Sequence, residues 1–415
     1  MLDRLTMKPL QGTITLPGSK SESNRALMVA AYGGFTTDIE NLSEAHDTVL
    51  MKTLLEQVHR HDSPEPLVVD CEDAGTVARF LMTYLACQPG EWVLTGTKRL
   101  CERPMAPLID ALRQLGADII PSDQNALPLR IHGKKLKGGR VTLDASQSSQ
   151  FATSLLLAAP TWDEGLQLTL TGETVSEPYI DMTLAMMEQF GVKTIRHSHT
   201  IVVAHQSYQP CRFTVSADWS AASYWYEMLA LSAGGSLLLR GLRQESLQGD
   251  AKVADLFKPL GINTEFTNNG VLITSKGIHL PTEKLLEFDF INTPDLFPSI
   301  LVTCVVLHFD AVFYGITTLF NKESDRVNSL ITELKEYYNF INIIGNDKLV
   351  IKKSSLSDNS VHFKSLSFNT LGDHRLAMAL AGLKVVFRDV EVDLPNAVNK
   401  SYPTFWDDVR TILGT

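Results

Sequence analysis

The sequence predicts an α/β protein built from about six copies of one unit, and two features of the 415-residue chain carry this prediction. Six segments begin with small polar or acidic residues and pass into an apolar, helix-like run; they start at Gly18, Asp73, Ser146, Ala217, Thr293 and Gly372. Amphipathic stretches follow most of them and end at a glycine before a strand-like run, near Gly116, Gly191 and Gly261. The six starts lie 55 to 79 residues apart.

The six helix starts share a property that bears on function. Each run is too apolar for an exposed helix, whereas its first turn is polar. Any α/β protein alternates helices and strands, but this combination is typical of buried helices whose N-termini meet at one place. A helix N-terminus exposes unpaired N–H groups and carries a partial positive charge, so it favours anions.

Length and composition bound the class of protein. The length predicts two or three domains, and 44% apolar with 20% charged residues is typical of a globular protein. A net charge of −10 argues against a general nucleic-acid or anionic-membrane binder, although it allows a local basic cleft. The longest apolar run, residues 300–316, contains His308 and Asp310 and is too short to cross a bilayer. The first ten residues lack the apolar segment of a secretory signal, so we expect a cytoplasmic protein.

Cysteine and histidine spacings do not predict a disulfide framework or a metal site. The five cysteines, an odd number without a CxxC pair, are Cys71, Cys87, Cys101, Cys211 and Cys304. We expect reduced thiols and no zinc. The pairs His59/His61 and His197/His199 have no acidic or thiol partner nearby, so we interpret them as surface histidines.

The first helix start, "PGSKSESNRAL" from residue 17, combines hydroxyls with Lys20 and Arg25. In the ordinary interpretation, Ser19, Ser21 or Ser23 caps the helix and the two cations are solvated. The segment is not a P-loop, because that motif needs glycine directly before the lysine. An anion site built from the cations, the hydroxyls and the helix N-terminus stays open.

Similar groups recur along the chain. Arg103 precedes a proline at a helix start, and Lys400 lies in a turn. Lys322 and Arg326 are spaced i, i+4, where like charges on one helix face repel by about 0.2–0.5 kcal/mol, so a bridging anion would be attracted there; in the ordinary interpretation the two cations lie on a solvated face. Arg375 lies in the first turn of an apolar helix, where a cation opposes the helix dipole. Together these cations predict a polyanionic substrate.

Two acidic residues could transfer protons. Asp295 lies at a helix start between Pro294 and an apolar run, and Glu323 adjoins Lys322. A carboxylate among cations usually has a lowered pKa and can accept a proton. Taken alone, each position favours the ordinary interpretation, which is an N-cap for Asp295 and an ion pair for Glu323.

Together these segments resemble the enolpyruvyl transferase family of 3-phosphoshikimate 1-carboxyvinyltransferase, also called EPSP synthase. The matching stretches run from Leu16 to about Trp406 and include "LPGSKSESNRAL", "DAGTVARF", "LTGTKRLCERPMAPLIDALRQLGA", "SSQFATSLLLAAP", "SEPYIDMTL", "KESDRV", "GDHRLAMA" and "NKSYPTFW". The combination of PGSKSxSNRAL with DHRxAM is very specific.

The resemblance implies a reaction of the shikimate pathway to chorismate and the aromatic amino acids. The 5-hydroxyl of shikimate 3-phosphate adds to C2 of phosphoenolpyruvate while C3 is protonated, and phosphate leaves the tetrahedral intermediate to give 5-enolpyruvylshikimate 3-phosphate. The resemblance also implies that no metal or organic cofactor is needed and that the protein is a monomer. From the net charge and the short apolar run we expect that no nucleic acid or membrane is bound.

The resemblance further implies the site residues. Those expected to bind shikimate 3-phosphate are Lys20, Ser21, Arg25, Ser148, Ser149, Gln150, Ser176, Asp295 and Lys322. Those expected to bind phosphoenolpyruvate are Lys20, Gly75, Arg103, Gln150, Arg326, Arg375 and Lys400. The expected catalytic residues are Asp295 as the base at the 5-hydroxyl, Glu323 for proton traffic at C3, and Lys20; how they divide the acid–base roles stays open.

The implied fold has two domains, each of three βαβαββ-like units, with the helix N-termini facing an interdomain cleft that holds the active site. Residues 1–18 join 217–415 in one domain, and residues 19–216 form the other. The sequence departs from the family pattern at Asp73 and Thr318, where many members have asparagine, and at Phe80, where proline is frequent. We therefore expect no ligand contact from Asp73 or Thr318.

Two alternatives stay open. The sister enzyme that transfers enolpyruvyl to a UDP-amino sugar commonly uses a loop cysteine as an acid, but Cys101 lies only two residues before Arg103, at the wrong spacing. A non-catalytic anion-binding protein on the same fold would be expected to lose Asp295, Glu323 or part of the arginine set, all of which are present.

Overall fold

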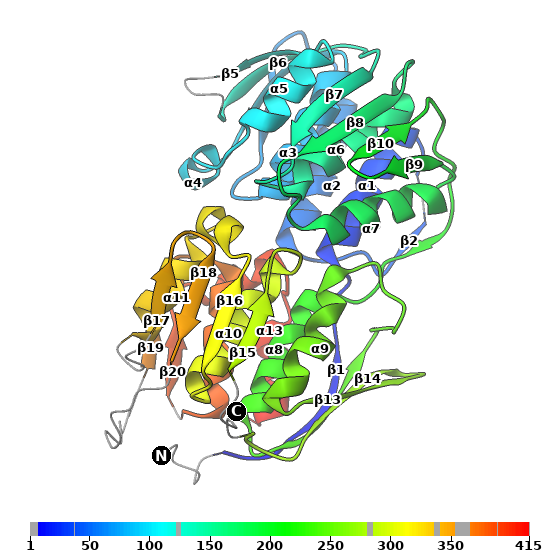
Figure 1. Cartoon of the computed structure of the whole chain (residues 1–415). Coiled ribbons are helices and arrows are strands. Elements are labelled where there is room, and N and C mark those ends of the chain that lie inside the picture. Colours follow the sequence, from blue (N-terminus) through cyan, green and yellow to red (C-terminus); the bar gives the residue numbers. More distant parts are fainter. Residues whose placement is uncertain are drawn as a thin grey trace. The chain divides into compact units, whose positions relative to one another are not determined.

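A computed structural model describes residues 7–36, 38–121, 126–279, 285–335, 341–352, 366–387 and 389–414 (Figure 1). The chain forms two compact units. The discontinuous unit comprises residues 1–18 and 216–415, and the continuous unit comprises residues 19–215.

The continuous unit contains two four-stranded sheets and a small parallel pair. The first sheet has the order β3 (Leu67–Asp70), β4 (Gly90–Thr95), β6 (Leu129–Gly133), β5 (Asp118–Pro121). The second has the order β7 (Gly139–Asp144), β8 (Leu166–Thr171), β10 (Thr200–Val203), β9 (Thr194–His197). In each sheet the first two strands are parallel and the later pairings are antiparallel. The small pair is β11 (Phe213–Thr214) with β2 (Ile39–Glu40).

The discontinuous unit repeats this arrangement. One sheet has the order β1 (Leu10–Thr15), β12 (Gly235–Arg240), β14 (Gly270–Ser275), β13 (Asn263–Thr267). The other has the order β15 (Leu286–Asp289), β16 (Ala311–Tyr314), β18 (Lys348–Ile351), β17 (Ile341–Ile344). A parallel pair is formed by β19 (Leu366–Phe368) and β20 (Val390–Val392).

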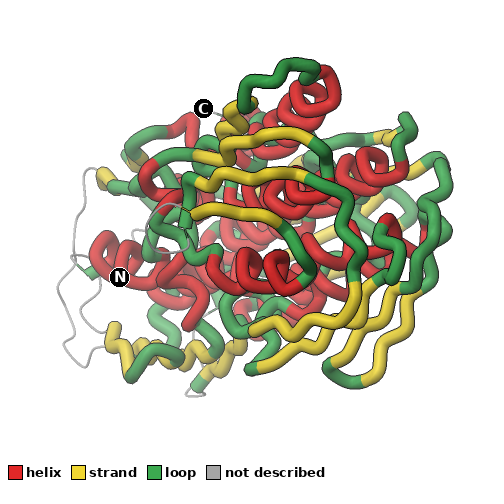
Figure 2. Tube along the Cα trace, turned by 90° about the horizontal axis from the view of Figure 1, so that it is seen from above, coloured by secondary structure: helices red, strands yellow, loops and turns green. Residues whose placement is uncertain are grey.

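Helices connect the strands in a repeated βαβαββ order, which confirms the predicted fold class. The helices that precede the second strand of the four larger sheets are α3 (Gly75–Cys87), α6 (Ser149–Ala158), α8 (Trp219–Leu231) and α10 (Phe297–Val306). The second helices are α5 (Ala106–Gln114), α7 (Glu177–Gln189), α9 (Val253–Phe257) and α11 (Arg326–Leu334). The remaining α-helices are α1 (Lys20–Gly33), α2 (His46–Arg60), α4 (Lys98–Cys101), α12 (His374–Ala381) and α13 (Phe405–Leu413). Figure 2 shows strands flanking these helices.

Each of the six predicted helix starts is followed by a helix, and three of these helices are wholly buried. Every residue of α8, α10 and α12 is buried. Their apolar surfaces form the core of the discontinuous unit, so only their polar first turns can present functional groups. The predicted glycine stops are also confirmed: Gly116, Gly191 and Gly261 all have left-handed backbone, with φ of 89°, 83° and 90°.

The strand β1 lies far in sequence from its neighbours. It pairs with β12 in parallel, with Leu10 opposite Gly235. A Cβ atom at residue 235 would lie 1.9 Å from the carbonyl oxygen of Leu10, and φ there is +126°. Glycine is therefore required at this position for the N-terminal strand to join the discontinuous unit.

A buried carboxyl interrupts the core of this unit. Glu227, on α8, is fully buried, and neither of its side-chain oxygens has a hydrogen-bond partner among the described residues. A Cβ atom at Gly382 would lie 2.9 Å from Glu227 Oε1, so the carboxyl packs closely against the chain after α12. Burial raises the pKa of Glu227 well above its usual value. The group is therefore held neutral in the folded protein.

We predict that Glu227→Gln stabilises the protein, and more so at high pH. The folded-state pKa lies above the unfolded value, so the unfolded chain releases a proton that the folded chain keeps. The wild-type protein therefore loses stability as the pH rises above the pKa of Glu227 in the unfolded chain. The glutamine variant does not lose this stability, because its side chain does not titrate. We expect a gain of about 1–2 kcal/mol near neutral pH and above, and a smaller gain near about pH 5.

Urea denaturation across this pH range measures the effect. Glu265→Gln, a change at an exposed glutamate of β13, is the matched control and should leave the stability near that of wild type. An equal effect of Glu227→Gln at every pH would contradict the neutral carboxyl.

Candidate functional site

The predicted site residues lie on both units. Those of the continuous unit are Lys20, Ser21, Arg25, Gly75, Arg103, Ser148, Ser149, Gln150 and Ser176. Those of the discontinuous unit are Asp295, Lys322, Glu323, Arg326, Arg375 and Lys400.

The first turn of α1 holds Lys20 in an ion pair. Ser19 is the N-cap, and its hydroxyl accepts a hydrogen bond from Glu22 N at 3.4 Å, so the capping interpretation is confirmed for this serine. Lys20 Nζ donates to Asp47 Oδ2 at 2.9 Å, and the two side chains are 14% and 3% exposed. The ordinary interpretation of Lys20 as a solvated cation is therefore wrong, because a buried carboxylate of α2 orients it. Sequence inspection missed Asp47, which is separated from Lys20 by 27 positions.

Arg25 is buried and joins α1 to α6 and α7. Its Nε donates to Thr183 Oγ1 at 2.9 Å, and Nη2 donates to the Tyr179 carbonyl at 3.1 Å. Nη1 donates to the Ser21 carbonyl at 2.9 Å, which fixes the backbone beside Lys20. Burial lowers the pKa of Arg25 to about 10, so the guanidinium stays charged at neutral pH. Direct contact of Arg25 with a ligand stays a prediction.

Two guanidinium groups meet at the N-terminus of α3. A Cβ atom at Gly75 would lie 2.5 Å from Arg103 Nη1 and 2.8 Å from Arg79 Nη1. Arg79 Nη1 donates to Gln150 Oε1 at 2.7 Å, and Gln150 Nε2 donates to Thr76 Oγ1 at 2.9 Å. Two cations beside a helix N-terminus favour an anion. The sequence analysis did not single out Arg79, although a lone arginine within an apolar helix, four residues after Gly75, is a usable signal.

Three serines lie at the starts of neighbouring helices. Ser148 is the N-cap of α6, where its hydroxyl accepts a hydrogen bond from Gln150 N at 3.2 Å, and Ser149 is buried. Ser176 is the N-cap of α7 and has left-handed backbone, with φ of 55°. Such a conformation is uncommon for a residue other than glycine and is often found at binding sites.

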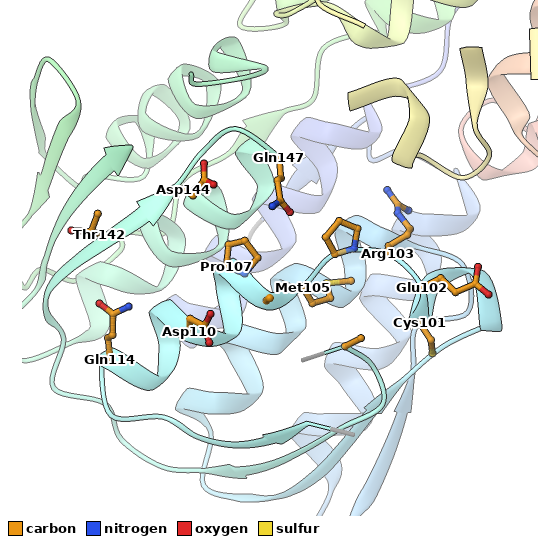
Figure 3. Close-up of a pocket in the computed structure, with 13 residues that line it drawn as sticks. Cys101, Glu102, Arg103, Met105, Pro107, Asp110, Gln114, Thr142, Asp144 and Gln147 are labelled. Carbon is orange, nitrogen blue, oxygen red and sulfur yellow. The ribbon is translucent and has the colours of Figure 1, made fainter. Parts of the chain in front are cut away.

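A hollow of about 540 Å³ lies beside Arg103, between the chain after α4, helix α5 and strand β7 (Figure 3). Besides Arg103, its lining includes the acidic residues Glu102, Asp110 and Asp144. The acidic lining disfavours an anion, so only the end at Arg103 suits one. Cys101 also lines this hollow, and burial raises the pKa of its thiol.

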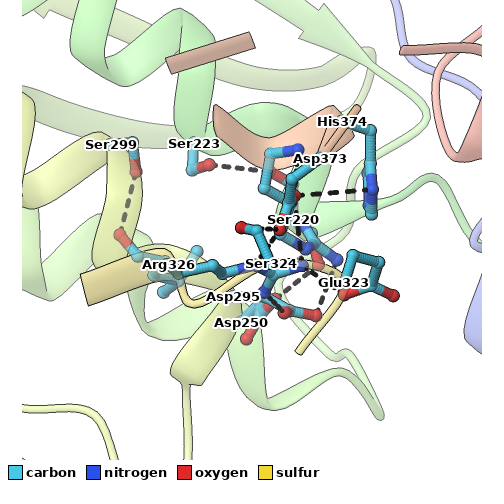
Figure 4. Close-up of polar contacts among 12 residues, drawn as sticks. Ser220, Ser223, Asp250, Asp295, Ser299, Glu323, Ser324, Arg326, Asp373 and His374 are labelled. Atoms are coloured by element: carbon cyan, nitrogen blue, oxygen red, sulfur yellow. Dashed lines mark hydrogen bonds and ion pairs between the residues drawn. The ribbon is translucent and has the colours of Figure 1, made fainter. Parts of the chain in front are cut away.

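In the discontinuous unit, Asp295 bridges two arginines (Figure 4 shows this cluster). Its Oδ1 accepts a hydrogen bond from Arg326 Nη1 at 2.9 Å, and its Oδ2 accepts one from Arg375 Nη2 at 2.6 Å. Arg326 Nη2 also donates to Glu323 Oε2 at 2.9 Å. Asp295 precedes α10 but does not cap it, so the N-cap interpretation is wrong; the ion-pair interpretation of Glu323 is confirmed.

Opposing effects set the ionisation of this cluster. Burial raises the pKa of Asp295, but the positive charges of Arg375, Arg326 and Lys322 lower it further, so that it lies well below its usual range. Burial likewise lowers the pKa of Arg326, whereas neighbouring carboxylates raise it above its ordinary value. Asp295 is therefore an ionised carboxylate that can accept a proton.

Asp373 positions both arginines, and the sequence analysis missed it. Its Oδ2 accepts from Arg326 Nε at 2.9 Å and from Ser324 Oγ at 3.0 Å. Its Oδ1 accepts from Arg375 N at 2.9 Å, so Asp373 is also the N-cap of α12. An aspartate directly before the first helical residue is a usable N-cap signal. Asp373 and Asp295 supply the negative charge that lets Arg375 lie in a first helical turn.

One expectation about the cations is wrong. Lys322 and Arg326 do not share a helix face, because α11 begins at Arg326 with Asp325 as its N-cap. Lys322 lies outside it, at the end of the 3-10 helix Thr317–Asn321. The carboxylates of Asp295 and Glu323 form ion pairs with Arg326. Lys400 is buried at the end of the 3-10 helix Pro395–Lys400.

Two further features are not found in the described part of the chain. Among the described residues there is no group of three or more histidine, cysteine or acidic side chains that could hold a metal ion. None of the helices in the described part of the chain is long and apolar enough to cross a membrane.

Comparisons with known proteins bear on the family. Residues 5–409 match the family model of EPSP synthase (3-phosphoshikimate 1-carboxyvinyltransferase). A 3-phosphoshikimate 1-carboxyvinyltransferase of Bacteroides fragilis (strain YCH46) is 39% identical over 406 residues, which cover 97% of this chain and 95% of the relative. One of Vibrio cholerae serotype O1 (strain M66-2) is 33% identical over 432 residues, covering 98% of each.

The fold resembles that of a solved structure. The structure of EPSP synthase from Acinetobacter baumannii superposes with a TM-score of 0.73 at 21% identity, covering 98% of this chain and 97% of that one. The family model and the curated relatives each span nearly the whole chain, and we conclude that it belongs to the EPSP synthase family.

Proposed function

We propose that the protein transfers the enolpyruvyl group of phosphoenolpyruvate to the 5-hydroxyl of shikimate 3-phosphate, releasing phosphate. The family supports this reaction, and the observation that carries it is the ionised Asp295 held between Arg326 and Arg375. This cluster combines a base with the cations that an anionic substrate needs.

In the addition step, the 5-hydroxyl oxygen forms a bond to C2 of phosphoenolpyruvate, its proton goes to a base, and C3 gains a proton. In the elimination step, C3 loses a proton and the bond from C2 to the phosphate oxygen breaks. We assign the base at the 5-hydroxyl to Asp295, because its pKa is held low. Glu323, beside Arg326, and Lys20, paired with Asp47, are the proposed groups for proton traffic at C3.

Binding is assigned to cations and helix starts on both units, and we propose that both contribute to one active site. Phosphoenolpyruvate is proposed to bind Lys20, Gly75, Arg103, Gln150, Arg326, Arg375 and Lys400. Shikimate 3-phosphate is proposed to bind Lys20, Ser21, Arg25, Ser148, Ser149, Gln150, Ser176, Asp295 and Lys322. We further propose that the two units are the two domains of the family fold and that the enzyme acts as a cytoplasmic monomer without a cofactor.

Phosphate release from phosphoenolpyruvate tests the reaction. Purified protein is given phosphoenolpyruvate with and without shikimate 3-phosphate, and the loss of phosphoenolpyruvate is followed in parallel. Release that requires both compounds supports the proposal. Release with a UDP-amino sugar instead, or binding of both compounds without release, would replace it with one of the alternatives above.

We predict that Asp295→Asn lowers kcat by about 10³-fold, because the amide keeps one acceptor oxygen but cannot take up a proton. The KM for phosphoenolpyruvate should not rise by more than about threefold, since the variant keeps both arginines and removes a negative charge beside them. Steady-state kinetics with both substrates measure the two constants. Glu287→Gln, at an exposed position of β15, is the matched control. A retained kcat would rule out Asp295 as the base.

We predict that Gly75→Ala raises the KM for phosphoenolpyruvate by about tenfold or more, with a smaller effect on shikimate 3-phosphate. The new Cβ would lie 2.5 Å from Arg103 Nη1, so this guanidinium must move, whereas the helix backbone can stay in place. Kinetics of the single variants and of Gly75→Ala with Arg103→Lys measure the coupling. Additive effects would show that the methyl group does not act through Arg103.

A further inference from the structure

Asp250 lies beside the Asp295 cluster, but the proposed reaction gives it no role. It belongs to the 3-10 helix Gly249–Lys252 and is 1% exposed. Its Oδ2 accepts a hydrogen bond from Ser220 Oγ, in the first turn of α8. Its Oδ1 has no hydrogen-bond partner among the described residues. Figure 4 shows Asp250 next to Asp295. A buried carboxylate would normally need more partners than one hydroxyl.

The charged groups that act on Asp250 come from three neighbouring elements. Asp295 lies before α10, Arg375 lies on α12, and Asp218 is the N-cap of α8. Burial and the negative charge of Asp295 raise the pKa of Asp250 to about 7, against the opposing effects of Arg375 and the Ser220 hydroxyl. The pKa of Asp295 is shifted the opposite way. Two nearby carboxyls whose pKa values are pushed apart take different protonation states at one pH.

We propose that Asp250 is a positioning residue that acts as a neutral carboxylic acid. Of these two carboxyls, Asp295 alone then carries a negative charge at Arg375. The substrate phosphoenolpyruvate, which is itself an anion, can therefore also bind at Arg375. The choice of anion rests on the proposed function. The protonated form also suits the geometry, because one buried oxygen has no donor that would stabilise a negative charge.

This role predicts a link between pH and substrate affinity. When Asp250 ionises, a further negative charge appears in the buried cluster around Arg375, and binding of an anion weakens. Conversely, an anion that binds at Arg375 favours the protonated form of Asp250, so binding is accompanied by proton uptake. If Asp250 only anchored Ser220 as a carboxylate, neither effect would arise.

The KM for phosphoenolpyruvate, measured from about pH 6 to about pH 9, tests the proposal. In the wild type it should rise about fivefold or more between about pH 6.5 and about pH 8.5. Asp250→Asn mimics the neutral acid, so its rise should be at least about threefold smaller, with kcat near pH 6.5 within about threefold of wild type. Asp255→Asn, a change at an exposed position of the following helix α9, should follow the wild type.

A second variant keeps the test decisive if Asp250→Asn folds poorly. Ser220→Ala removes the hydrogen bond that favours the ionised form, so the rise in KM should move to higher pH. Parallel profiles for wild type, Asp250→Asn and Ser220→Ala would overturn the proposal.

A stability measurement separates failure of this proposal from failure of the proposed reaction. Because the folded-state pKa of Asp250 lies above its unfolded value, wild-type stability should fall relative to Asp250→Asn between about pH 4 and about pH 7. Urea midpoints of the two proteins measure this without any substrate. A constant difference across this range would show that folded Asp250 is ionised and would overturn the proposal, whatever the activity.

Discussion

The bridging of Arg326 and Arg375 by the single carboxylate of Asp295 is the interaction on which the candidate chemistry depends. Both arginine side chains are nearly inaccessible, at 1% and 6% exposure. Removing such charges from water is costly, and buried ion pairs often add little net stability. The cluster is better explained by function, because fixed cations beside an ionised base need no rearrangement when charge develops in a reaction.

The burial of α8, α10 and α12 makes this cluster possible. Their apolar surfaces pack into one core, so that the polar first turns come together. Ser220 comes from the start of α8, Asp295 from the turn before α10, and Asp373 with Arg375 from the start of α12. The continuous unit has the same arrangement of candidate site residues at helix starts, since Lys20, Gly75 and Ser149 are the first residues of α1, α3 and α6. In both units, hydrophobic burial fixes the positions and the helix ends supply the chemistry.

The sequence predicts the parts of this arrangement that depend on local signals. Polar-to-apolar transitions mark the six helix starts, and Gly116, Gly191 and Gly261 mark helix ends, because capping and left-handed glycine act within a few residues. The placement of the N-terminal strand β1 in the discontinuous unit depends instead on the contact of Leu10 with Gly235. These two residues are far apart in the sequence, so no local pattern predicts their contact.

The partners of the predicted residues escaped prediction for the same reason. Asp47 orients Lys20, Arg79 holds Gln150, and Asp373 holds Arg326, yet the members of these pairs lie 27, 71 and 47 positions apart. Spacing also misled the interpretation of Lys322. The i, i+4 rule applies only inside a helix, and α11 begins too late to include that lysine.

Two buried acids in the discontinuous unit show why burial alone does not make a functional group. For Glu227, burial is the only cause of the raised pKa, so its protonation responds to nothing in the site. For Asp250, burial and Asp295 act against Arg375 and Ser220, and the balance falls near neutral pH. An anion that offsets the charge of Arg375 weakens the effect by which Arg375 lowers the pKa of Asp250. The same anion leaves the pKa of Glu227 unchanged. Proton uptake linked to substrate binding therefore belongs to Asp250, the acid whose neighbours are charged.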